Sequence, residues 1–242
     1  MTSSKWLESP AREFLLGLRD QLPILLGVVP FGLIFGALAR SAGIPPLESQ
    51  AFSILIFAGS SQFIATSLVA ETTPAIIVVL TILLVNLRHM LYSAALAPHL
   101  ARLPLRWKIA LAWLLTDEAF AMASVRYKDP DRGYPHWYFL GTGLTLWASW
   151  QLSTFLGITL GSILPGTALL DFALPLTFLA LLVPTLVDRP TLLVALTAGG
   201  LAAALAGLPF KLGLMIAVTF SVGLGVWFEI YQEKTGPEAA AR

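Results

Sequence analysis

The stretch that decides the fold is PAIIVVLTILLVNLRHMLYSAALAP, residues 74–98. It is long enough to cross a bilayer, because a helix needs about 20 apolar residues to span the hydrocarbon core. Asn86, Arg88 and His89 interrupt it at a depth where one charge costs at least ~2.5 kcal/mol even on the gentler insertion scales. We therefore expect these polar residues to have a specific use inside the protein.

A second apolar run, residues 107–125, carries Thr116, Asp117 and Glu118 in its middle. Ionisable residues at membrane depth usually mark a substrate path, an ion path, or the salt bridge that frames one. The two runs together predict an intramembrane polar site between neighbouring helices.

Composition supports a membrane protein. Hydrophobic residues make up 57% of the 242 residues and charged residues only 12%, against about 25% in soluble domains. The mean hydropathy is +0.79, and too few residues lie outside the apolar runs to form a second soluble domain. The absence of cysteine excludes disulfides, thiolate metal sites and a cysteine nucleophile. A net charge of +1 argues against a nucleic-acid partner, and no motif predicts a metal or cofactor.

The fold class we predict is all-α: a polytopic helical membrane protein of about eight transmembrane helices. The expected spans are 21–40, 49–69, 74–97, 107–125, 136–163, 171–188, 190–208 and 210–229. Residues 1–20 mix charged and apolar residues without a cleavage site, so we expect an interfacial helix rather than a signal peptide. Residues 21–231 form the transmembrane domain, and residues 232–242 a disordered tail.

Lysine and arginine placement tests the number of spans, because cytoplasmic loops are enriched in both residues. With eight spans and a cytoplasmic N-terminus, nine lie inside and five outside. The inside residues are Lys5, Arg12, Arg19, Arg126, Lys128, Arg132, Arg189, Lys234 and Arg242, and the outside residues are Arg40, Arg102, Arg106, Lys108 and Lys211. A re-entrant second run would leave seven spans and seven basic residues on each side. Eight spans are favoured, although Arg102, Arg106 and Lys108 fit poorly outside.

A weak internal repeat is visible. Residues 31–36 (FGLIFG) resemble residues 156–161 (LGITLG), and each segment precedes a proline-containing loop and an acidic residue, Glu48 or Asp171. A repeat of four spans plus four would give two halves of the same orientation. The alternative is that Gly-x-x-x-Gly marks tight helix packing.

Residues 59–62, Gly59-Ser60-Ser61-Gln62, form a poor helix interior because glycine adds backbone entropy and serine competes for backbone hydrogen bonds. A helix broken here would expose backbone N–H groups, which bind carboxylates well. The alternative is a continuous helix whose small residues pack against a neighbour.

Helix phase divides the first polar cluster between two faces. Asn86 and His89 share one face, which Tyr92 and Ser93 extend, whereas Arg88 points away from it. Arg88 is either a snorkelling or structural ion-pair residue or a direct substrate contact. His89 is either a satisfied interior histidine or a proton relay.

Asp117 and Glu118 point about 100° apart on a helix. The depths of the two runs allow Arg88 to pair with one carboxylate while the other faces a cavity. Either carboxylate is then a candidate proton carrier or ammonium site, and the alternative is a purely structural ion network. Proline and glycine in the first and sixth spans (Pro23, Pro30, Pro175 and Pro184 among them) predict kinks, and apolar side chains of those spans are expected to line an aliphatic pocket.

Several motifs of other functional classes are missing. No glycine-rich phosphate loop ends in lysine, and neither His-Glu-x-x-His nor Gly-x-Ser-x-Gly occurs. We therefore expect a protein that is not an enzyme and does not hydrolyse ATP itself. No ring of like charges or repeated carbonyl filter supports an ion-selective pore.

Four blocks together resemble the AzlC family of bacterial branched-chain amino acid permeases. They are GVVPFGLIFG (27–36), FAGSSQF (57–63), NLRHMLYSAALAP (86–98) and LTDEAFA (115–121), and the resemblance extends over about residues 12–230. It implies the large subunit of an inner-membrane exporter of leucine, isoleucine and valine, acting with a small AzlD-like membrane subunit.

The sequence hypothesis is therefore an exporter of branched-chain or other neutral apolar amino acids, coupled to the proton gradient, with lipid and a possible homo-oligomer as further partners. Backbone N–H groups of residues 59–62 would bind the carboxylate, with Asn86 nearby. Asp117 or Glu118 would receive the ammonium group or proton, Arg88 would balance one carboxylate, and His89 would relay protons. The alternatives are an accessory subunit whose charges serve folding, and a permease subunit that imports amino acids.

Overall fold

The structure is a computed structural model that describes residues 9–128, 134–161, 188–209 and 212–235, together with residues 179 and 186. Within these residues all helices are right-handed and no strand is present. The chain divides into two compact units, the first made of residues 1–70 and 78–165 and the second of residues 71–77 and 166–242. The all-α prediction is therefore confirmed, and each unit is described separately.

The first unit has three long helices, and a pair of short helices lies between each long helix and the next along the chain. The long helices are α1 (Pro10–Ser41), α4 (Ala75–Leu100) and α7 (Pro135–Leu160), and the short ones are α2 (Pro46–Leu55), α3 (Gly59–Ala70), α5 (Leu105–Trp113) and α6 (Asp117–Tyr127). Pro23 and Pro30 lie inside α1 without interrupting it. The short helices come in pairs, and each pair occupies one run that the sequence predicts as a single span.

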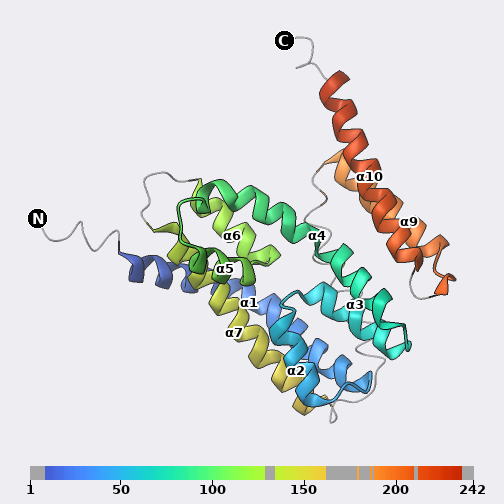
Figure 1. Cartoon of the computed structure of the whole chain (residues 1–242), viewed down its shortest axis with the longest axis horizontal. Helices are drawn as coiled ribbons and strands as arrows, with labels where there is room; N and C mark the ends of the chain where they lie inside the picture. The colour runs from blue at the N-terminus through green and yellow to red at the C-terminus, as the bar shows by residue number, and fades with distance from the viewer. Residues whose placement is uncertain are drawn as a thin grey trace, which may run out of the picture. The chain divides into compact units, whose positions relative to one another are not determined.

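Helices α1 and α7 pack side by side through glycines and run parallel (Figure 1). A Cβ on Gly17 would lie 2.2 Å from the Tyr138 carbonyl oxygen, and one on Gly36 would lie 2.3 Å from that of Thr154. These contacts advance in the same direction along both helices. Only glycine allows two helix backbones to approach so closely.

The glycine contacts bear on the predicted repeat. Gly36 of the first Gly-x-x-x-Gly segment meets the backbone around Gly157 of the second. The interpretation as a packing motif is thus supported. The parallel course of α1 and α7 agrees with a four-plus-four repeat, but residues 171–187 of its second half lie mostly outside the described residues. The repeat stays a prediction.

The second predicted span is interrupted: α2 ends at Leu55, residues 56–58 leave the helical conformation, and α3 begins at Gly59. Phe57 and Ala58 at this tip are buried, and a Cβ on Gly59 would meet the Trp150 ring at 3.0 Å. The predicted interruption of this run is present, but it lies at residues 56–58, and Gly59–Gln62 form the first turn of α3 rather than the break itself.

The direction of α3 follows from its contacts with α4. The first turn of α3 contacts Asn86 and Arg88, which lie about 16 and about 20 Å along α4 from its first residue at a rise of 1.5 Å per residue. The remaining length of α3 covers a similar distance, and only residues 71–74 then lead into α4. Residues 46–70 therefore enter and leave by the same end, as a helical hairpin.

The fourth predicted span is a second hairpin. Helix α5 runs back along the C-terminal half of α4, with Leu111 packed in one core cluster with Leu96. Residues 114–116 break the helix, and Thr116 caps α6 by accepting from the Ala119 N–H at 3.3 Å. Helix α6 then returns along α4, because the Tyr92 and Phe120 rings stack at 4.5 Å and the His99 and Tyr127 rings at 5.0 Å.

The two hairpins enter the first unit from opposite ends, and their tips approach the middle of α4 (Figure 1). The prediction that runs 49–69 and 107–125 each cross the membrane is therefore wrong. Each hairpin arm has 9 to 12 residues, which reaches only about halfway across a 30 Å core. Two polar breaks at mid-depth, rather than a shortage of apolar residues, turn the chain back.

We call the two ends of this unit the Ser41 end, which also holds Pro46 and Leu160, and the Leu100 end, which also holds Pro10 and Pro135. Helix α4 runs opposite to α1 between them. A long helix followed by a hairpin therefore occurs twice, once in each direction, which is the arrangement of an inverted repeat.

Basic residues are distributed unequally between these ends. The described residues at the Leu100 end include Arg12, Arg19, Arg102, Arg106, Lys108, Arg126 and Lys128, whereas Arg40 is the corresponding basic residue at the Ser41 end. The prediction that Arg102, Arg106 and Lys108 lie on the opposite side from Arg12 is wrong, because the second hairpin returns the chain to the end it left.

The second unit contains α9 (Arg189–Ala204) and α10 (Leu212–Thr235), which pack antiparallel: a Cβ on Gly213 would meet Leu205, and one on Gly225 would meet Val194. Asp188 caps α9 by accepting from the Thr191 N–H at 2.8 Å. The expected span 171–188, with Pro175 and Pro184, lies almost wholly outside the described residues.

Length and apolarity identify α1 and α4 as helices able to cross a membrane, and residues 189–204 and 212–228 as shorter apolar helices. The described part of the predicted interfacial segment, from Pro10 to Asp20, continues without a break into the first span as α1. Its placement at a membrane surface stays a prediction. The predicted tail lies mostly outside the described residues.

Candidate functional site

Arg88 joins the two hairpin tips. Its Nη1 donates to Asp117 Oδ2 at 2.5 Å, and its Nη2 donates to Ser60 Oγ at 2.7 Å. Asp117 opens α6 and Ser60 lies in the first turn of α3. One guanidinium therefore holds the start of one helix from each hairpin. The Arg88–Asp117 ion pair that the sequence analysis considered feasible is present.

A second contact ties the first hairpin to α4. Ser61 Oγ donates to Asn86 Oδ1 at 2.6 Å, and the Ser61 side chain is fully buried. Asn86 and Arg88 thus both reach α3, although helix phase places them on different sides of α4. The length and flexibility of the arginine side chain account for this.

The start of α3 offers backbone donors. The first N–H groups of a helix have no acceptor within it, and the described hydrogen bonds supply none for Gly59, Ser60 or Ser61. The helix dipole adds partial positive charge at the same place. Together with the guanidinium, these donors form a surface suited to a carboxylate.

The ion pair is neither fully buried nor fully hydrogen-bonded. The side chains of Arg88 and Asp117 remain 32% and 41% exposed, while Arg88 Nε and Asp117 Oδ1 are buried atoms without a hydrogen-bond partner. Such groups are costly to leave unpaired. Arg88 Nε and Asp117 Oδ1 are thus a donor and an acceptor that an amino-acid carboxylate and ammonium could use, and the Tyr92 side chain interacts with the same carboxylate.

The other predicted residues lie around this junction. Gln62 is completely buried and neither atom of its amide has a partner. His89 meets the Tyr92 ring edge-to-face with centroids 5.9 Å apart. Glu118 follows Asp117 in the first turn of α6 and is partly buried. Hydrogen bonds join five of the predicted residues in two groups. Arg88 bonds Ser60 and Asp117, and Ser61 bonds Asn86.

A second charged cluster escaped the sequence analysis. Arg126 Nε donates to Glu13 Oε2 at 2.8 Å, a second bond joins Arg126 Nη2 to Glu13 Oε1, and both side chains are buried. The Arg126 guanidinium lies 5.1 Å from the Tyr138 ring centroid, and Tyr138 donates to Asp20 at 3.1 Å. This cluster ties the far end of α6 to α1 and α7. Residues 113 positions apart give no sequence signal of their pairing.

Metal binding has no support in the part of the chain that the structure describes, where no group of three or more His, Asp or Glu residues is placed to hold an ion. The chemistry available at the junction is recognition of charge and hydrogen-bonding groups.

Comparison with known proteins shows the family to which this chain belongs. The model of the AzlC protein family matches residues 23–164, which hold both hairpins and the Arg88 junction. The chain belongs to the AzlC family. The resemblance found in the four sequence blocks is thereby confirmed.

Relatives of this AzlC chain are named as membrane proteins. It is 34% identical over 200 residues to the inner membrane protein YgaZ of Escherichia coli, which covers 80% of each chain. It is 35% identical to an uncharacterized membrane protein of Archaeoglobus fulgidus, over 75% of this chain and 80% of the relative. A third relative, 27% identical over 76% of this chain and 72% of its own, is the branched-chain amino acid transport protein AzlC of Bacillus subtilis. No solved structure matches the chain.

Proposed function

We propose that this AzlC-family protein transports neutral amino acids with apolar side chains across the bacterial inner membrane, in the outward direction. The observation that carries the proposal is the Arg88–Asp117 pair with its spare donor and acceptor at the meeting point of two hairpin tips. The name of the Bacillus relative supports the same class of substrate.

The substrate zwitterion enters between the two partners of the ion pair. Its carboxylate replaces Asp117 on Arg88 and uses the N–H groups at the start of α3, while its ammonium binds Asp117, with Glu118 adjacent. Charge is balanced before, during and after this exchange. That balance matters because an uncompensated charge in a low-dielectric site costs several kcal/mol.

Opposed hairpins give the site a route to either side. Each hairpin closes the path toward the end from which it enters, and Arg88 holds both tips. When the substrate carboxylate binds the Arg88 guanidinium in place of Asp117, the second hairpin is released from Arg88. Short helices with discontinuous backbones are the moving parts of many transporters.

The distribution of basic residues supports one orientation of the protein in the membrane. The Leu100 end carries seven of the described basic residues named above and the Ser41 end carries Arg40, so the Leu100 end faces the cytoplasm. The N-terminus is then cytoplasmic, and residues 1–20 lie at the inner membrane surface ahead of the transmembrane domain, residues 21–231.

Proton coupling and the partner complete the proposal. Glu118 and His89 lie within one helical turn of Asp117 and Arg88 along their own helices, where protonation changes the charge balance of the exchange. A small AzlD-like membrane subunit acts with the chain. The protein is not an enzyme, which agrees with the transport name of its Bacillus relative.

Transport by purified protein tests the proposal. The chain is placed in liposomes with and without a co-expressed AzlD-like subunit, and counterflow of labelled leucine is followed under an imposed pH gradient. We expect leucine transport that Asp117→Asn reduces at least ~10-fold, the effect of about 1.4 kcal/mol of lost binding free energy. Transport at the level of the natural sequence by both Asp117→Asn and Glu118→Gln, at normal expression, contradicts the acidic site.

The alternative is an accessory subunit in which the ion pair serves folding and another chain provides the path. The hydrogen bonds of Arg88 to both hairpins favour this alternative as well. The exchanged pair Arg88→Asp with Asp117→Arg separates the two roles. Full recovery of both expression and transport supports the structural role, whereas recovery of expression alone supports substrate binding by these two positions.

A further inference from the structure

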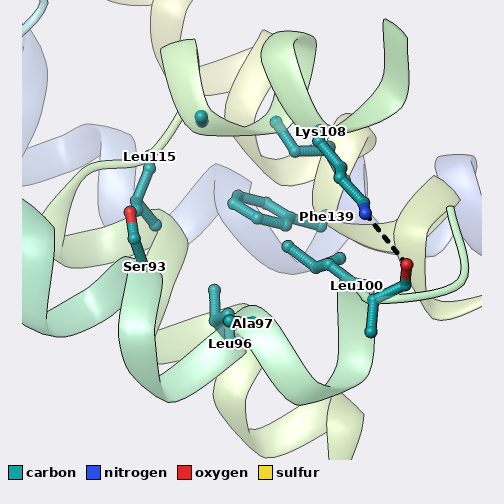
Figure 2. A pocket seen from close by; sticks show the side chains of 10 residues that line it. Ser93, Leu96, Ala97, Leu100, Lys108, Leu115 and Phe139 are labelled. Carbon is teal, nitrogen blue, oxygen red and sulfur yellow. Dashed lines mark hydrogen bonds between the residues drawn. The ribbon is translucent and has the colours of Figure 1, made fainter. Parts of the chain in front are cut away.

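A cavity of about 220 Å³ lies between α4 and α5, over Phe139 of α7 (Figure 2). Its walls are almost entirely aliphatic or aromatic, with the Ser93 hydroxyl and the Lys108 ammonium as the polar groups. Its walls include Leu96 and Ala97 of α4, Leu111 and Ala112 of α5, Leu115 beyond the end of α5, and Phe139 of α7. The sequence analysis expected an aliphatic pocket in the first and sixth spans instead, and its description of the site did not include this cavity.

One end of the cavity adjoins the proposed zwitterion site. Leu115 precedes Asp117 by two residues at the tip of the second hairpin, and Ser93 follows Arg88 by five residues on α4. At a helical rise of 1.5 Å, Ser93 is about 7.5 Å along α4 from Arg88. Leu115 therefore brings one wall of the cavity next to Asp117, within reach of the side chain of a substrate whose ammonium that carboxylate holds.

A charged side chain lies at the other end of the cavity. Lys108 Nζ donates to the Ala101 carbonyl oxygen at 2.9 Å, and Figure 2 shows this bond across the cavity from Ser93 and Leu115. A short aliphatic side chain can fill the apolar part of the cavity without covering this ammonium, whereas a lipid chain or an apolar partner helix that covered the whole cavity would desolvate it. The cavity is thus a short apolar chamber that ends in a polar group at the Leu100 end.

We propose that this chamber, between α4 and α5 with Phe139 as its floor, binds the branched aliphatic side chain of the transported amino acid and sets its size limit. The inference rests on the proposed function, because the head group is held by Arg88 and Asp117. A cavity of about 150 Å³ lined by similar residues accommodates benzene, so this volume suffices for a leucine or isoleucine side chain. Leu96, Leu111 and Phe139, each at most 2% exposed, form the rigid part of the wall.

Filling the chamber tests the inference. Ala97→Leu adds bulk from α4 and Ala112→Leu adds bulk from α5, so either variant suffices if the other fails to fold. Ala95→Leu is the matched control, because it makes the same change on α4 two positions away and does not line the cavity. Counterflow of leucine, valine and alanine is measured in proteoliposomes for each protein, with the partner subunit present.

The expected result is a graded loss in both chamber variants. One methylene in an apolar pocket is worth about 10- to 200-fold, so leucine transport falls at least ~10-fold, valine transport falls less, and the ratio of alanine to leucine transport rises. Ala95→Leu keeps the ratios of the natural sequence. Equal loss for all three amino acids, or no change in their ratios, overturns the chamber as the side-chain site while leaving the proposed function intact. Absence of amino-acid transport by the natural sequence overturns both.

Discussion

Arg88 of α4 and Asp117 of α6 meet at 2.5 Å across 29 positions of sequence, and the same guanidinium also binds Ser60 of α3. The pair therefore lies where two hairpins from opposite ends approach one another. Its side chains are about one-third to two-fifths exposed, which places it between a sealed structural ion pair and an open site.

Removing one partner of this pair should cost more than removing both. Arg88→Gln and Asp117→Asn each leave one charge without its partner, and we expect each to lower the free energy of unfolding by about 1–3 kcal/mol, less than the 3–5 typical of sealed pairs. The double variant should recover most of this stability and still fail to transport leucine. Thermal unfolding in detergent and counterflow measure the two effects. A double variant that transports normally contradicts a substrate role.

Membrane topology is testable because the natural chain contains no cysteine. Single cysteines at Gly43 and Glu71 flank the first hairpin, and those at Arg102 and Lys128 flank the second. We expect Gly43→Cys and Glu71→Cys to react with an impermeant maleimide from one side of the membrane, and Arg102→Cys and Lys128→Cys from the other. Labelling of either flanking pair from opposite sides would show that its run crosses the membrane.

The contact between α1 and α7 should not tolerate a methyl group. Gly36→Ala places a Cβ 2.3 Å from the Thr154 carbonyl oxygen and 2.6 Å from the Ile158 nitrogen, so the two backbones must separate. We expect a loss of about 1–3 kcal/mol of stability, as for other overpacked sites. Gly27→Ala is the control in the same helix, because nothing lies within 4 Å of its Cβ. Equal melting temperatures for both variants would contradict the close packing.

The buried Glu13–Arg126 pair should matter more for stability than for transport. Glu13→Gln leaves Arg126 buried without its counter-charge, which typically costs about 3–5 kcal/mol. Exposed Glu48 serves as control, since Glu48→Gln removes a charge from the first turn of α2. Fluorescence-detected size exclusion during heating reports the difference. We expect leucine affinity of the surviving folded protein to be unchanged, because this cluster lies away from the Arg88 junction.

The bond from Ser61 to Asn86 should fix the tip of the first hairpin. Ser61→Ala leaves the Asn86 amide oxygen without its donor, at a cost of about 1 kcal/mol. Ser67→Ala on the same helix is the matched change, because Ser67 bonds only the Phe63 carbonyl oxygen one turn earlier. Hydrogen exchange at α3 amides should rise in the first variant and stay constant in the second. Equal hydrogen exchange in the two variants would show that the Ser61–Asn86 bond does not stabilise the tip of the first hairpin.

The sequence by itself determined the class of the molecule and much of its site. Apolar runs of bilayer length required membrane helices, since composition and length are local properties, and Gly-Ser-Ser-Gln predicted a helix break because its residues disfavour helix locally. The costly charges at mid-depth in residues 86–89 and 116–118 identified the place where helices must meet.

The tertiary structure decided which runs cross and what surrounds the site. A run of about 20 apolar residues has the same composition whether it crosses or returns as a hairpin, so residues 49–69 and 107–125 were predicted as spans. Pairing across long separations, as in Arg126 with Glu13, and the chamber between α4 and α5 depend on how helices pack. Packing depends on contacts between residues that are far apart in the sequence. The local sequence around Arg88 and Asp117 therefore does not determine it.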